Sequence, residues 1–203
     1  SRPPSLTWNF VMLNLDYLPK PEYEGHMPPS KEVCELWRDI RSIVGYDTLL
    51  EIGLNAGHSS AINLELFPTV HVTSVDIGRH DWTELGANVL KTKFHDRFNF
   101  VLCHSTAYFE RVQKGEYEHP HPDTIFIDGG HDISHVINDI RMGQWMGCKY
   151  LIIDDIKSNN VKLIVETLMT FGVLKLIKEY TYKCVNTSKP NNAVGLYKCQ
   201  PIQ

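Results

Sequence analysis

The stretch Asp47–Asp76, DTLLEIGLNAGHSSAINLELFPTVHVTSVD, predicts the fold of this chain. It starts with a short apolar run, passes through a glycine-bearing loop into a helical segment, and ends in a second apolar run that finishes on an acid. This order is typical of a βαβ unit that binds a nucleotide, in which the final acid accepts hydrogen bonds from ribose hydroxyls. We therefore expect Asp76 to hold a nucleoside.

Apolar runs and helical patterns alternate on both sides of this unit. Strands are predicted near residues 48–53, 70–76, 98–103, 123–128 and 149–154, and helices near 31–44, 57–67, 82–94, 105–114, 132–146 and 159–171. In the tail, KLIKEYTYKC and AVGLYKC flank a polar loop, which favours two antiparallel strands. The expected fold class is α/β: a doubly wound, Rossmann-like, mostly parallel seven-stranded sheet with an antiparallel C-terminal edge, between two helix layers.

The composition is that of an ordinary soluble protein. The chain has 203 residues, of which 42% are hydrophobic and 22% charged, so one domain with a substantial core is expected. A net charge of −4 offers no positive field to a phosphate backbone, and nucleic acid is not an expected partner. No apolar run approaches the roughly 20 residues that span a bilayer, so no membrane partner is expected. The first ten residues lack a secretory layout, and the five scattered cysteines suit a reducing compartment, so a cytoplasmic location is expected.

Two regions are predicted along the chain. Residues 1–29, punctuated by six prolines, form an N-terminal arm or lid, and residues 30–203 form a single domain. Ser30 is a good N-cap for the first helix of that domain, and Gly45 is a good residue to end it. Two readings stay open for the arm, a lid over the substrate or ordinary packing, and both concern Tyr17, Tyr23, His26 and Met27.

The loop EIGLNAG departs from a dinucleotide-binding loop. Its glycines, Gly53 and Gly57, stand four residues apart, whereas the G-x-G-x-x-G pattern would need glycine where Asn55 and His58 stand. The loop therefore lacks the arrangement that places a pyrophosphate on a helix N-terminus, which argues for a nucleoside without a diphosphate. Ser59 opens the following helix, where free N–H groups favour a carboxylate.

This loop resembles the first motif of class I S-adenosylmethionine-dependent methyltransferases, acid-x-Gly-x-Gly-x-Gly, with Asn55 in place of the central glycine. The resemblance covers roughly residues 47–156. It extends to the metal-dependent O-methyltransferases, both the catechol type and the type that modifies antibiotic sugars. It implies S-adenosylmethionine as the cofactor, with the following residues at its binding site: Glu51, Gly53, Gly57 and Ser59 around the methionine part, Asn55 in the same loop, Asp76 on the ribose, and His104 with Ser105 beside the adenine.

Three aspartates stand where two predicted strands end. Asp128 ends the run IFID, and Asp154 and Asp155 end the run YLIIDD. If these parallel strands are neighbours, their tips lie roughly 5 Å apart, and the carboxylates would repel one another without a cation. Oxygen ligands suit Mg²⁺ or Mn²⁺. The resemblance implies the same three metal ligands. The alternative is that Asp154 and Asp155 are solvated acids that cap the next helix.

His131 is the predicted general base, and Asp128 the second catalytic residue. In the resembling sugar-modifying enzymes some members keep a histidine at the position of His131. A metal-bound hydroxyl would have a lowered pKa, His131 would take its proton, and the oxygen would attack the sulfonium methyl group in line. The expected function is therefore a metal-dependent O-methyltransferase that acts on a small hydroxylated molecule, such as a sugar, a diol or a phenol.

Other functions stay open at this point. A metal-independent methyltransferase acting on nitrogen, protein or RNA would keep the cofactor loop and drop the ion. A catalytically inactive module would bind the nucleoside alone, and an NAD-dependent oxidoreductase is disfavoured by the loop spacing. The sequence also leaves open a homo-oligomer and the identity of the methyl acceptor.

Overall fold

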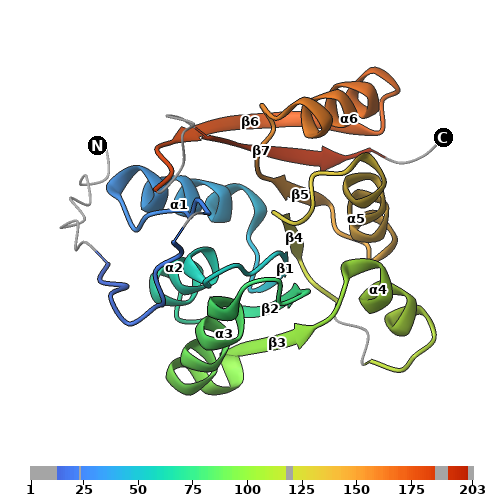
Figure 1. The fold of residues 1–203 in the computed structure, drawn as a ribbon. Helices are drawn as coiled ribbons and strands as arrows, with labels where there is room; N and C mark the ends of the chain where they lie inside the picture. The colour runs from blue at the N-terminus through green and yellow to red at the C-terminus, as the bar shows by residue number, and fades with distance from the viewer. Residues whose placement is uncertain (1–12, 23, 118–120, 186–191, 201–203) are drawn as a thin grey trace, which may run out of the picture.

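The computed structural model describes residues 13–22, 24–117, 121–185 and 192–200. Helices and strands alternate along most of this length (Figure 1). The elements are, in order, α1 (Lys31–Val44), β1 (Thr48–Ile52), α2 (His58–Leu66), β2 (His71–Asp76), α3 (Asp81–Phe94), a 3₁₀ turn (His95–Arg97), β3 (Phe98–Leu102), α4 (Ser105–Gln113), β4 (Thr124–Ile127), α5 (Ile133–Trp145), β5 (Tyr150–Ile153), α6 (Asn159–Thr170), β6 (Leu174–Tyr182) and β7 (Asn192–Cys199).

The strands form one sheet in the order β3-β2-β1-β4-β5-β7-β6. Strands β1 to β5 run parallel, and β7 inserts antiparallel between β5 and β6. The strand order reverses at β1, so the loops after β1 and β4 leave the same edge of the sheet side by side. Open α/β sheets bind ligands at such a point. The predicted fold class, with its antiparallel C-terminal edge, is confirmed.

Most helix boundaries also follow the sequence signals. The Ser30 hydroxyl accepts a hydrogen bond from the Val33 amide at 3.3 Å, and so caps α1. Gly45 ends that helix in the left-handed conformation, with φ +71°, which glycine adopts at no steric cost. Among the described residues, no helix combines the length and apolar character needed to cross a membrane.

Helices cover both faces of the sheet. Helices α1, α2 and α3 lie on one face, and α4, α5 and α6 lie on the other (Figure 1). A separate buried cluster of apolar side chains stands under each layer. The sheet is therefore buried on both faces, as its continuous apolar strands require.

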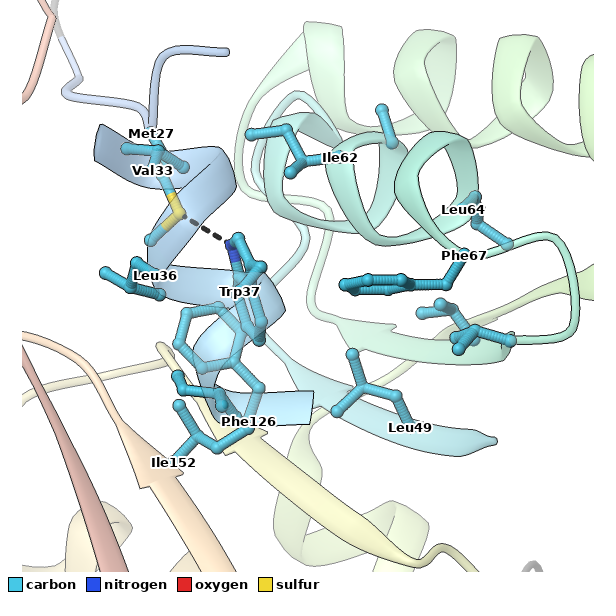
Figure 2. Close-up of a cluster of buried hydrophobic side chains, with 14 of the residues drawn as sticks. Met27, Val33, Leu36, Trp37, Leu49, Ile62, Leu64, Phe67, Phe126 and Ile152 are labelled. Carbon is cyan, nitrogen blue, oxygen red and sulfur yellow. Dashed lines mark hydrogen bonds between the residues drawn. The ribbon is translucent and has the colours of Figure 1, made fainter. Parts of the chain in front are cut away.

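Trp37 anchors the core on the α1 face. Its fully buried ring meets Phe126 of β4 edge to face, with ring centroids 5.2 Å apart. Its indole nitrogen contacts the sulfur of Met27 at 3.1 Å (Figure 2). Met27 belongs to the N-terminal arm and is only 5% exposed. This end of the arm is therefore packed into the core of the domain.

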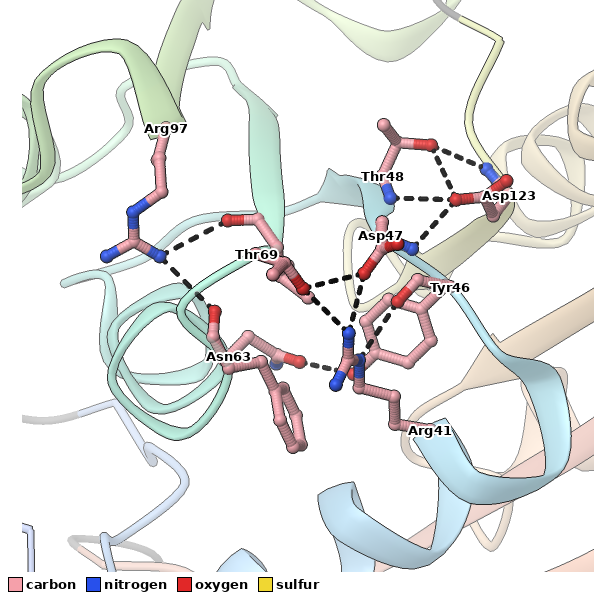
Figure 3. A network of polar contacts seen from close by, with 10 residues as sticks. Arg41, Tyr46, Asp47, Thr48, Asn63, Thr69, Arg97 and Asp123 are labelled. Atoms are coloured by element: carbon pink, nitrogen blue, oxygen red, sulfur yellow. Dashed lines mark hydrogen bonds and ion pairs between the residues drawn. The ribbon is translucent and has the colours of Figure 1, made fainter.

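A polar network holds the sheet at the edge where the parallel strands begin (Figure 3). One carboxylate oxygen of Asp123 accepts hydrogen bonds from the amides of Asp47 and Thr48, both at 2.8 Å. Asp47 in turn accepts hydrogen bonds from Arg41 at 2.6 Å and from Thr69 at 2.8 Å. These contacts join α1, β1 and the segments leading into β2 and β4. They therefore stabilise the register of β1 against its two neighbouring strands, β2 and β4.

Trp37→Ala should lower the free energy of unfolding by about 3–5 kcal/mol, because it leaves a large cavity among buried side chains. The change is measured by urea unfolding. Leu163→Ala on α6 is the control, because this leucine is 56% exposed and should change stability by less than about 0.5 kcal/mol. Equal losses in the two variants would contradict the role of Trp37.

Candidate active site

A cavity of about 730 Å³ opens at the carboxyl ends of the parallel strands. Loops after β1 to β5 all contribute to its lining. Two segments far away in the sequence complete the walls: residues 24–27 of the arm, and the C-terminal hairpin through Tyr182, Cys184 and Asn192. The candidate site residues on the loops after β1 to β5 therefore lie around one cavity.

Gly53 brings the loop after β1 against the loop after β4. Its φ is +96°, and a Cβ at this position would collide with the backbone carbonyl of Asp128. Its amide donates to the carbonyl of Val75 at 2.8 Å, which ties the same loop to the end of β2. Glycine alone suits both the close approach to Asp128 and the φ of +96°, because it has no Cβ and adopts positive φ freely.

Asp76 lines the cavity and also holds the cofactor loop in shape. One of its carboxylate oxygens accepts hydrogen bonds from the amides of Leu54 at 2.7 Å and Asn55 at 3.1 Å. The other accepts from the amide of Gly78 at 2.8 Å. A carboxylate oxygen offers two lone pairs, so one lone pair of Oδ1 is left for a ribose hydroxyl. The predicted ribose contact stays a prediction.

Glu51, Gly57 and Ser59 are not among the residues that line this cavity, and their predicted place around the methionine part stays a prediction. Glu51 is fully buried beneath the loop, where it accepts hydrogen bonds from Ser59, Ser60 and Ser74. Burial raises the pKa of Glu51 to about 7, and the three hydroxyl donors oppose that rise. Gly57 starts α2 with φ +90°. These residues support the loop from behind because β1 and α2 converge there.

His104 and Ser105 do line the cavity, at the start of α4. The Nδ1 atom of His104 accepts a hydrogen bond from the Thr106 amide at 3.2 Å, so this imidazole caps the helix. The ring of His135 meets that of His104 with centroids 4.7 Å apart and lines the same wall. No local sequence pattern indicates a site role for His135, since its ring partner His104 is 31 residues away.

Asp128, His131 and Asp155 form a candidate metal centre. One potential ligand atom from each lies within 4.8 Å of the others, and His131 Nε2 is 2.9 Å from Asp155 Oδ2. Asp155 adopts φ +53°, a conformation uncommon outside glycine. Such strain tends to persist where it serves a site.

Asp154, which the sequence predicts as a third carboxylate ligand, lies beside this group and is engaged by other partners. Its Oδ2 atom accepts a hydrogen bond from the Tyr182 hydroxyl at 2.8 Å, and its Oδ1 accepts from the Asp155 amide at 2.8 Å. It is 4% exposed and still borders the cavity. The predicted role of Asp154 as a metal ligand, like that of His131 as the general base, stays a prediction.

The ionised forms of Asp128 and Asp154 at this edge are disfavoured by burial and by neighbouring negative charges. Burial, followed by the charge of Asp155, raises the pKa of Asp154 to about 7. Burial also raises the pKa of Asp128 well above its ordinary value, and the charges of Asp154 and Asp155 add to that rise. A divalent cation would relieve this repulsion, and the carboxylate-rich donor set suits Mg²⁺ or Mn²⁺.

Comparison with known proteins agrees with this geometry. Residues 50–145 match the family described as a methyltransferase domain. This match agrees with the class I, S-adenosylmethionine-dependent methyltransferases that the cofactor loop resembles. None of the curated proteins compared with this sequence matches it.

Solved structures share the fold of this methyltransferase domain at low identity. A proposed O-methyltransferase from Klebsiella pneumoniae has a TM-score of 0.65 at 14% identity, over 85% of this chain and 81% of that one. The O-methyltransferase from Bacillus cereus, solved with S-adenosylhomocysteine, has a TM-score of 0.61 at 16% identity, over 84% and 82%. A proposed RNA methyltransferase from Pyrococcus horikoshii has a TM-score of 0.61 at 12% identity, over 88% of each chain. The fold is thus shared by enzymes described with different acceptors.

Two histidines join the arm to the methyltransferase domain. The ring of His26 packs on that of His58, with centroids 4.0 Å apart. Burial lowers the pKa of both, and the charge of His26 contributes to a pKa of about 3 for His58. The sequence suggests His26 as a residue of the arm but gives no sign of its partner. Of the other arm residues considered, Tyr23 lies outside the described residues, and Tyr17 donates to Glu65 at 3.0 Å, away from the cavity.

Acid should destabilise the domain through His58. The unfolded chain binds a proton near the ordinary pKa of 6.5, whereas the folded chain does so near 3, so stability falls as the pH drops through that window. Between about pH 7 and about pH 4.5, wild type should lose about 2–3 kcal/mol more stability than His58→Phe. Urea unfolding at the two pH values measures the difference. Parallel losses would show that His58 does not carry this effect.

Proposed function

We propose that this domain transfers the methyl group of S-adenosylmethionine to a hydroxyl oxygen of a small molecule, at a site that also binds Mg²⁺ or Mn²⁺. One observation carries the proposal: the cofactor loop and the group formed by Asp128, His131 and Asp155 open into one cavity. The backbone contact of Gly53 with Asp128 holds the two together. A methyl donor and an ion-bound acceptor would therefore lie next to each other.

The residues present suit a divalent ion. Asp128 and Asp155 offer carboxylate oxygens, which hard cations prefer, and Asp154 borders the same cavity with a third carboxyl group. Burial first, and then the charges of neighbouring carboxylates, raise the pKa values of Asp128 and Asp154, so a cation at this point would stabilise their ionised forms. When bound, the ion would orient the acceptor hydroxyl and lower its pKa.

Different side chains bind the cofactor and remove the proton during the transfer. Asp76 holds the cofactor loop through the amides of Leu54 and Asn55 and accepts a hydrogen bond from a ribose hydroxyl with the remaining lone pair of Oδ1. His131 takes the proton of the acceptor hydroxyl at Nδ1, and Asp155, 2.9 Å from Nε2 of the same ring, stabilises the imidazolium that forms. The oxygen forms a bond to the methyl carbon as the carbon–sulfur bond breaks, so the sulfonium becomes a thioether. Positioning supplies much of the rate in such a displacement.

A small, polar acceptor fits this cavity best. Besides the cofactor loop, its lining offers charged and hydrogen-bonding side chains, with Tyr182 and Asn192 on the hairpin wall. The net charge of −4 gives no attraction for a nucleic acid backbone. A sugar or another diol could present two oxygens to one ion, and a phenol would use the same group with fewer polar contacts.

A metal-independent methyltransferase acting on nitrogen, protein or RNA is the second candidate. It is favoured by the shared fold of the proposed RNA methyltransferase from Pyrococcus horikoshii. The two candidates differ in their need for the ion. Full methyl transfer after exhaustive EDTA treatment would favour the second, and activity restored by Mg²⁺ or Mn²⁺ would favour the first. An inactive binding module would take up S-adenosylhomocysteine and transfer no methyl group to any acceptor.

Asp155→Asn should weaken Mg²⁺ binding by at least about tenfold, because an amide oxygen replaces a charged ligand. S-adenosylhomocysteine affinity should stay within about twofold, since Asp155 lies beyond the cofactor loop. Isothermal titration of Mg²⁺ into the S-adenosylhomocysteine complex measures the first effect. Asp96→Asn is the matched control, an exposed aspartate far from the cavity. Unchanged Mg²⁺ affinity in Asp155→Asn would refute the metal centre.

His131→Ala should lower kcat by about 10²- to 10⁴-fold, the usual contribution of a general base. Cofactor affinity should change little, because the side chain faces Asp155 and not the cofactor loop. The measurement is methyl transfer to the best acceptor from a panel of sugars, diols and phenols. If kcat is retained in this variant across the pH range, His131 is not the base.

A further inference from the structure

Asn55 stands where the resembling loops have glycine, and it keeps a backbone conformation that glycine favours. Its φ is +52°, in the left-handed region. An L-residue with a side chain pays conformational free energy there, although asparagine tolerates it better than most. A side chain retained at such a position is expected to have a task.

Both polar ends of the Asn55 side chain are engaged. Its Oδ1 atom accepts a hydrogen bond from the indole nitrogen of Trp82 at 2.7 Å. Its Nδ2 atom donates to the backbone carbonyl of Gly25 at 3.0 Å. The amide therefore links three segments: the cofactor loop, helix α3 and the N-terminal arm.

A second contact holds the arm beside the first. His80 stacks on Trp82, with ring centroids 4.5 Å apart and the planes within 11° of parallel. Its Nε2 atom lies 2.8 Å from a carboxylate oxygen of Glu24. Consecutive arm residues, Glu24 and Gly25, are thus held by side chains that contact each other.

The arm also reaches the opposite wall of the cavity. The amide and carbonyl of His26 pair with the carbonyl and amide of Val185, both at 3.2 Å, in a short antiparallel bridge. Residues 24–27 line the cavity between these attachments. The segment therefore spans from the cofactor loop to the C-terminal hairpin.

We propose that Asn55 is a positioning residue that latches residues 24–27 across the cavity as a cover over the cofactor. The cofactor then leaves only when the hydrogen bond from Asn55 to Gly25 opens. This inference rests on the cofactor site of the proposed function. It gives the Asn55 side chain a role in holding the arm, in place of the direct cofactor contact that the loop motif implies.

Two variants of Asn55 test the latch. Asn55→Gly restores the usual loop residue, relaxes the backbone and removes both side-chain bonds. Asn55→Asp keeps the acceptor for Trp82 and tolerates the same φ, but it cannot donate to Gly25. Both should release S-adenosylhomocysteine at least about five- to tenfold faster in stopped-flow displacement, the effect of losing the hydrogen bond to Gly25 that both variants lack. Asn99→Asp, the same change on the exposed surface of β3, is the control and should leave the release rate unchanged.

Hydrogen exchange at the His26 amide supplies a readout that loop damage alone would not change. In wild type, S-adenosylhomocysteine should slow this exchange, since a cover that retains the ligand is itself retained by it. The protection should be lost in both Asn55 variants. Glu24→Gln, which leaves the loop intact and weakens the contact with His80, should speed ligand release in the same direction.

The outcomes separate this inference from the proposed function. If wild type fails to bind S-adenosylhomocysteine, the cofactor site itself is wrong. If wild type binds it but both Asn55 variants release it at the wild-type rate, the latch is overturned. It is equally overturned if the ligand leaves His26 exchange unchanged in wild type, or if Glu24→Gln releases the ligand no faster.

Discussion

The close approach of two backbone segments at Gly53 and Asp128 is the constraint on which this site depends. Strands β1 and β4 are neighbours, and the loops that follow them meet with no room for a Cβ at Gly53. This contact places the loop shaped by Asp76 directly beside the carboxyl groups after β4 and β5. A donor site and an acceptor site on separate loops therefore share one cavity.

The acidic residues serve two different ends of the sheet. Where the parallel strands begin, Asp123 accepts hydrogen bonds from backbone amides and stabilises the register of β1 and β4. Where they end, Asp128 and Asp154 are enclosed near other carboxyl groups, and their pKa values rise. Burying like charges together is unfavourable unless a partner neutralises them. At the edge where the strands begin, backbone amides balance the charge of Asp123. At the edge where they end, we expect a bound ligand to balance the charge of Asp128 and Asp154.

Segments remote in the sequence complete this edge. The arm reaches the cavity through the packing of Met27 on Trp37 and of His26 on His58. The hairpin reaches it through Tyr182, which donates to Asp154. The arm attaches to the buried core and the hairpin attaches to Asp154. Both segments that line the cavity are therefore in contact with the residues beneath it. A change in either wall is expected to reach the loops that carry the chemistry.

The sequence by itself determined the order of strands and helices, the caps at Ser30 and Gly45, and the acids at the strand ends, because these signals are local. Hydrophobic periodicity and capping depend on residues a few positions apart. The pairing of Ile127 with Ile153 then brings Asp128 and Asp154 to one edge, as the parallel arrangement predicts. Only the tertiary structure decided how individual side chains are used. Asp154 turns to Tyr182, 28 residues away, and Glu51 turns inward to serines from α2 and β2, because such partners are chosen by packing between elements and leave no periodic trace in the chain.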